Sequence, residues 1–64
     1  MKVTKAERSA LEAYARHGSA KAAAYALGKS PRTVEKQLGT AQKRTGSSSP
    51  VQAAFRVLLP DMRD

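Results

Sequence analysis

Apolar residues recur at helical spacing in four segments of this chain, and each segment is flanked by residues that start or stop helices. The first segment begins at Thr4, where Glu7 three residues later predicts a capping box, and it ends near His17, before Gly18. The positions expected to form its inner face are Ala6, Ala10, Leu11, Tyr14 and Ala15.

The second and fourth segments have start and stop residues of their own. The second follows Ser19, is rich in alanine, and reaches Leu27, after which Gly28 is placed to end it. The fourth has a serine cap, a proline at its first position, a glutamine that completes a second capping box, and a closing proline. In order, these residues are Ser49, Pro50, Gln52 and Pro60.

Residues 30–46 predict the best-marked helix, and its two faces differ. Ser30 is placed as the N-cap, Pro31 occupies the first helical position, and Gly46 is placed to end the helix in a left-handed conformation. At about 100° per residue, one face is polar and mostly basic: Arg32, Glu35, Lys36, Gly39, Thr40 and Lys43. About half a turn away lies the face expected to be buried: Val34, Leu38, Ala41 and Thr45.

The pattern predicts an all-α fold of four short helices, because no stretch alternates β-branched and polar residues over the length of a strand. We expect one domain in residues 1–60 and a C-terminal tail in residues 61–64. The second and third helices are joined only by about residues 28–30, which is the short glycine-containing turn of a helix-turn-helix unit. In that unit the second helix enters the major groove of DNA.

The core of this domain must be small. Twelve of its apolar residues are alanine, and no cysteine is present to form a disulfide or a thiolate zinc site. A domain of this size buries only about 60% of its unfolded surface. Stability must therefore come from capped helices, close alanine packing or a partner chain.

The chain is strongly basic, with a net charge of +7 and a pI near 10.4. Such a balance is typical of domains that meet nucleic acid, an anionic membrane or an acidic protein, although solubility alone is an alternative. No segment approaches the roughly 20 apolar residues of a membrane span, and the N-terminus lacks the apolar run of a signal peptide. We expect a cytoplasmic, nucleoid-associated protein with no membrane partner.

Two stretches of the chain match a known pattern. Residues 3–7 are VTKAE, similar to the opening Leu-Thr-Pro-x-Glu, and residues 30–38 are SPRTVEKQL, similar to Ser-Pro-x-Thr-Val-x-x-His-Leu. A Gly-Ser turn follows at residues 46–49. From Val3 to about Leu58 the chain therefore resembles the LuxR/GerE-type helix-turn-helix DNA-binding domain. The segment around the turn is also similar to sigma-factor region 4 and to some phage and transposase proteins.

The resemblance implies a DNA-binding site on the third helix. The positions that it places against bases are Glu35, Lys36 and Gly39, and those that it places near phosphates are Thr33, Lys43 and Arg44. Lys36 can donate to guanine, and Glu35 can accept from cytosine. Glycine inside a helix costs about 1 kcal/mol of stability relative to alanine. Two explanations for Gly39 are close approach to DNA and neutral drift. Together with the basic face, the candidate DNA-binding residues are Arg32, Thr33, Glu35, Lys36, Gly39, Thr40, Lys43 and Arg44.

The chain departs from the family at three positions where members carry a large apolar residue: Lys29, Thr45 and Ser47. We expect these substitutions to thin the core further. Tyr25 lies beside the alanine face of the second helix, where we expect partial burial; a contact with a phosphate or a partner is the alternative.

The fourth helix has more apolar residues than one buried face requires. We expect the core to receive Val51, Ala54, Phe55 and Leu58. Val57 and Leu59 fall outside this set and are expected to be exposed, which predicts a homodimer contact. LuxR/GerE domains are similar in using their last helix in this way. Two isolated surface residues are the alternative.

Nothing in the sequence indicates catalysis. His17 is the only histidine, the loop serines have no base to activate them, and no glycine-rich phosphate loop is present. We predict a protein that is not an enzyme, with no catalytic residues, no cofactor and no metal.

The leading hypothesis is a stand-alone DNA-binding transcriptional regulator that reads double-stranded DNA with helix 31–45 in the major groove, as a dimer. Without a sensor domain in this chain, control is expected from its abundance or from a protein partner. One alternative is a helix-turn-helix interaction module that inhibits a regulator or a polymerase subunit. Another is an accessory protein of phage DNA packaging or recombination.

Overall fold

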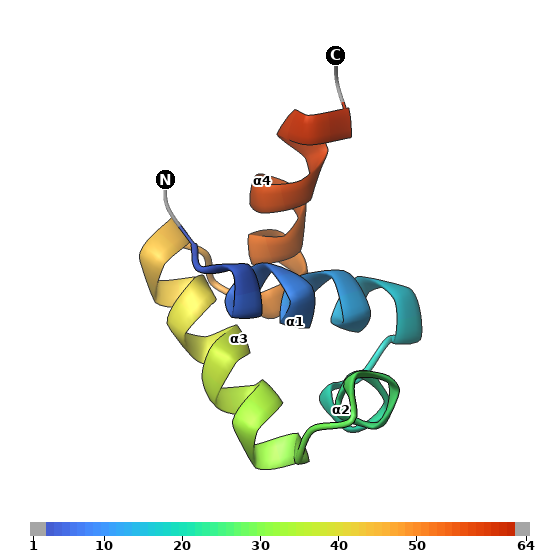
Figure 1. Ribbon diagram of the computed structural model, residues 1–64. Coiled ribbons are helices and arrows are strands. Elements are labelled where there is room, and N and C mark those ends of the chain that lie inside the picture. The colour runs from blue at the N-terminus through green and yellow to red at the C-terminus, as the bar shows by residue number, and fades with distance from the viewer. Residues whose placement is uncertain (1–2, 63–64) are drawn as a thin grey trace.

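The computed structural model describes residues 3–62, with side chains up to Leu58, and this part of the chain consists of four helices without a strand. They are α1 (Lys5–His17), α2 (Ala20–Leu27), α3 (Pro31–Thr45) and α4 (Pro50–Met62). In Figure 1, α1 crosses the middle of the molecule, α3 runs along one side, α4 rises above, and α2 is seen end-on below. The predicted all-α fold of four short helices is confirmed.

Local sequence explains why the first three helices begin and end where they do. Thr4 Oγ1 accepts from Glu7 N at 3.1 Å, and Glu7 Oε1 accepts from Thr4 N at 3.0 Å, so the predicted capping box is confirmed. Ser19 and Ser30 cap the next two helices by accepting a backbone N–H three residues on. Each of these three helices ends at a glycine in the left-handed conformation: Gly18, Gly28 and Gly46.

The start of α4 differs from the predicted capping box. Ser49 Oγ accepts from Gln52 N at 3.2 Å, as expected, but Gln52 Oε1 does not complete the box. Instead it accepts from Ser48 N at 2.7 Å and from Ser48 Oγ at 3.2 Å. Ser48 offers two donors to this one oxygen, whereas the capping box offers one.

The end of α4 also differs from the prediction, because Pro60 does not close the helix. A proline removes its own N–H, but the N–H groups that follow it can still donate. Residues 61–62 therefore belong to α4 and not to the predicted tail. The remaining two tail residues, 63–64, lie outside the described residues.

The core is small and consists mostly of alanine, as expected. The buried apolar side chains are Ala10, Leu11, Ala13, Ala23, Ala24, Val34, Leu38, Ala41, Ala53 and Ala54. Leu11 and Val34 are the largest that are fully buried. Small side chains let helices lie close together, so this core gains contact by close approach more than by side-chain volume.

The predicted buried face of α3 is confirmed: Val34, Leu38, Ala41 and Thr45. The inner face of α1 is only partly correct, because Ala15 is exposed while Glu7 and Ala13 are buried. The helix α1 contacts α2, α3 and α4, so its buried surface is wider than one stripe and reaches residues that the apolar pattern leaves out.

The predicted orientation of α4 is only partly correct. As predicted, Ala54 is buried and Leu58 packs partly buried against the core. Val51 and Phe55, however, are 49% and 58% exposed, whereas Ala53 is buried. Val57, expected to be exposed, packs partly buried against the core. Alanines allow α4 to lie close to its neighbours, which turns the bulkier side chains outward. The side chain of Leu59, also predicted to be exposed, lies outside the described residues.

We predict that Glu7→Ala lowers the free energy of unfolding by about 1 to 2 kcal/mol, because a helix cap and an ion pair are lost together. The melting temperature should fall by about 4 to 8 °C per kcal/mol, measured by circular dichroism. The control is Glu7→Gln, which keeps an oxygen for the Thr4 N–H but loses the charge. If both substitutions cost the same, the capping bond does not contribute as described.

Candidate nucleic-acid interface

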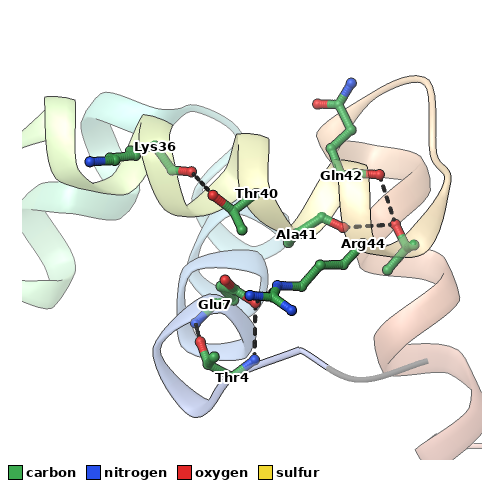
Figure 2. Close-up of polar contacts among 8 residues, drawn as sticks. Thr4, Glu7, Lys36, Thr40, Ala41, Gln42 and Arg44 are labelled. Carbon is green, nitrogen blue, oxygen red and sulfur yellow. Dashed lines mark hydrogen bonds and ion pairs between the residues drawn. The ribbon is translucent and has the colours of Figure 1, made fainter.

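The C-terminal end of α3 is tied to the start of α1 by an ion pair. Arg44 Nε lies 3.3 Å from Glu7 Oε1, and the Glu7 side chain is only 8% exposed. Figure 2 shows Arg44 reaching from α3 to Glu7, whose carboxylate also faces Thr4, while Lys36 lies well away. Arg44, which the resemblance placed near phosphate, therefore has an internal partner that holds α3 in place.

A second contact ties the same end of α3 to α4. Arg56 Nη1 donates to the Thr45 carbonyl oxygen at 2.9 Å and so satisfies one of the free carbonyls at the helix terminus. The buried Thr45 hydroxyl donates to Ala41 O at 2.9 Å and lies 2.6 Å from Ser47 Oγ. Two of the three polar replacements in the family pattern, Thr45 and Ser47, thus bond to each other.

Two of the predicted contact residues use their hydroxyls within the helix. Thr33 Oγ1 lies 2.9 Å from Ser30 Oγ, inside the N-cap. Thr40 Oγ1 donates to Lys36 O at 3.0 Å, which occupies its only proton. Thr40 therefore has no proton left for a phosphate in this arrangement. Thr33 differs, because it can accept from the Ser30 hydroxyl and keep its own proton for a phosphate.

The remaining predicted residues lie together on the outer face of α3. Arg32, Glu35, Lys36 and Lys43 are exposed, and Gly39 is partly exposed among them. Beside them is a hollow of about 350 Å³. Its lining residues include Ser19 and Ala20, at the N-cap and the start of α2, and Glu35, Gly39 and Gln42 of α3. We define this surface, from Arg32 to Lys43, as the α3 face.

Gln42 belongs to the α3 face and was missed from the sequence. It follows Gly39 by three residues and Glu35 by seven, so helical spacing alone places the three side by side. Its carboxamide can both donate and accept, which is the chemistry that reads adenine in the major groove.

Positive charge on the α3 face is available to a partner. Residues 19–46 hold six of the twelve lysines and arginines of the chain but one of its five acidic residues. The ion pairs found between described side chains are Arg8–Glu12 and Arg44–Glu7. None of them involves Arg32, Lys36 or Lys43, so these three cations of the described chain are not neutralised internally.

Gly39 is not required by packing. A Cβ atom added at this position would meet no other atom within 4 Å, and the backbone there is ordinary helix. Glycine in a helix interior nevertheless costs stability relative to alanine. If position 39 must lack a side chain, the reason therefore lies outside the described residues.

The described residues contain no group of three or more His, Cys, Asp or Glu side chains that could hold a metal ion. None of their helices combines the length and the apolar character that crossing a bilayer requires.

Comparison with known proteins gives no match to a protein-family model, to a curated protein or to a solved structure. The LuxR/GerE resemblance therefore stays a prediction that rests on the residues of this chain alone.

We predict that Gly39→Ala stabilises the protein by about 0.5 to 1 kcal/mol, because alanine favours the helix and its Cβ meets open space. Thermal unfolding followed by circular dichroism measures the change. The matched control is Gly46→Ala, where the Cβ also meets open space but φ is +65°, so the substitution should destabilise. A loss of stability from Gly39→Ala would show that the side chain does not fit.

Proposed function

We propose that this protein is a DNA-binding transcriptional regulator that inserts α3 into the major groove of duplex DNA. The observation that carries the proposal is the α3 face, where Arg32, Lys36 and Lys43 are exposed without an internal ion pair. Basic side chains on one face of a helix whose C-terminal end is held by α1 and α4 are suited to groove binding. The short α2–α3 connection supports the same proposal.

The side chains of the α3 face suit a division of roles. Lys36, Glu35 and Gln42 can address guanine, cytosine and adenine edges, respectively. Arg32 and Lys43 suit phosphates, which fix the position of the helix on the duplex without reading sequence. Because Arg44 is paired with Glu7, its proposed role is to position α3 and not to hold phosphate.

We propose that the protein binds DNA as a homodimer through α4. Val51 and Phe55 are exposed. Together with Tyr14 and Leu58, they line a hollow of about 360 Å³. No charged residue is among its described lining residues, although the chain carries +7. A charge-free contact lets two such chains approach. In this proposal Val51 and Phe55 take the place of Val57, which packs against the core.

We predict salt-dependent duplex binding that is sensitive to the α3 face. In fluorescence anisotropy, the slope of log affinity against log salt should be about −0.9 per phosphate contacted. Lys43→Ala should weaken binding to all sequences and reduce the slope by about 1, whereas Lys36→Ala should relax sequence preference. Lys5→Ala, an equal loss of charge on α1, is the control. A protein without duplex affinity at low salt contradicts the proposal.

We predict that Phe55→Asp converts a dimer to a monomer without unfolding it, because the side chain is 58% exposed and a charge would face its symmetry mate. Sedimentation equilibrium measures the mass, and circular dichroism confirms helix content. Tyr25→Asp, which alters another exposed aromatic residue, is the control and should leave the mass unchanged. If the wild-type protein is monomeric with and without DNA, the dimer proposal fails.

A further inference from the structure

The outer side of α2 and the turn that follows it carry an exposed aromatic residue and two lysines. Tyr25 is 91% exposed, which makes it the most exposed large apolar residue among the described side chains. Lys21 lies four residues before Tyr25 on α2, so these two share one side of the helix. Lys29 follows Gly28, beyond the end of α2, and lines the same hollow as Tyr25 and Lys21. Neither lysine takes part in an ion pair found between described side chains.

The same side of α2 is hollowed. An open hollow of about 560 Å³ is lined by His17, Lys21, Ala22, Tyr25, Ala26 and Lys29, among others. We call this region the α2 surface. Apart from two lysines and a histidine, its lining residues are alanine, proline, tyrosine and one serine, and none of its described lining residues is acidic.

The exposure of Tyr25 is costly in a protein whose core is so small. Burying a tyrosine ring in the core would contribute more apolar area than any alanine there. The helix instead turns Ala23 and Ala24 inward and leaves the ring in solvent. An exposed aromatic residue on a concave apolar surface with a charged rim is typical of a protein-binding site.

We propose that the α2 surface binds an acidic, partly apolar segment of a partner protein. An apolar side chain of that segment enters the hollow against Tyr25 and Ala26, and its carboxylates pair with Lys21 and Lys29. Charge complementarity identifies the partner as acidic, since the rim is positive. The apolar walls favour a peptide over a DNA backbone, whose phosphates need donors along the whole contact.

This inference goes beyond the proposed DNA binding and does not depend on it. Pro31, at the start of α3, lines the hollow, but Arg32, Lys36 and Lys43 do not, so these cations of the α3 face are not part of the α2 surface. The geometry therefore permits one chain to hold DNA and an acidic protein segment at the same time.

The test uses the full chain, labelled with nitrogen-15, and a synthetic 14-residue helical peptide with glutamates on one face and leucines and one tryptophan on the other. Amide shifts should move around Tyr25, Lys21 and Lys29 in a saturable way. Two control peptides replace all glutamates by glutamine or all apolar residues by serine. Each should bind at least about tenfold more weakly if both charge and apolar contact contribute.

Matched variants separate the two surfaces. Tyr25→Ala and the pair Lys21→Gln with Lys29→Gln should each weaken peptide binding about tenfold or more. The control pair Lys36→Gln with Lys43→Gln removes the same charge from the α3 face and should leave peptide affinity within about twofold, while lowering duplex affinity.

Three outcomes overturn the proposal. Equal losses from the two lysine pairs would mean that the peptide senses only net charge. Amide shifts centred on the α3 face or on Phe55 would mean that the peptide binds another surface, and the absence of shifts would mean that it does not bind. Displacement of the peptide by a short DNA duplex, with Tyr25 shifted by the duplex, would assign the α2 surface to DNA. Loss of duplex binding alone bears on the proposed function and not on this surface.

Discussion

The burial of Leu11 and Val34 is the interaction on which the rest of the structure depends. These are the largest fully buried side chains among the described residues, one from α1 and one from α3. Around them the core is mostly alanine, which adds little apolar area but allows the helices to lie close together. Because the apolar contribution is small, helix caps and polar contacts must supply much of what fixes α3.

Because the core is small, polar contacts are needed to hold α3, the helix that carries the candidate site. Glu7 serves twice, since its carboxylate caps α1 through the Thr4 N–H and pairs with Arg44 of α3. Arg56 of α4 holds the same helix end through the Thr45 carbonyl. The basic residues used in this way lie at the end of α3 and on α4, so the cations of the α3 face stay free for an outside partner.

Sequence reasoning succeeded where the determinants are local. The caps at Thr4 and Ser30 and the glycine at position 46 set helix ends within a few residues, and helical spacing fixed the buried face of α3. It failed where the determinants are distant in sequence. The Arg56–Thr45 bond joins residues eleven positions apart, and the rotation of α4 that exposes Phe55 depends on how closely alanines let helices pack. Neither leaves a periodic signal in the chain.

The same distinction applies to the candidate sites. Spacing alone placed Lys36 and Lys43 on one face, whereas the partner of Arg44 lies on another helix and the occupied proton of Thr40 is a matter of side-chain geometry. The central claim is that α3, held at its C-terminal end by α1 and α4, presents its free face to duplex DNA. The most direct measurement is amide shift mapping of the nitrogen-15-labelled protein during titration with a short duplex at low salt. The account predicts shifts concentrated at Arg32, Lys36, Gly39 and Lys43; shifts centred on α1 or α4, or none, would contradict it.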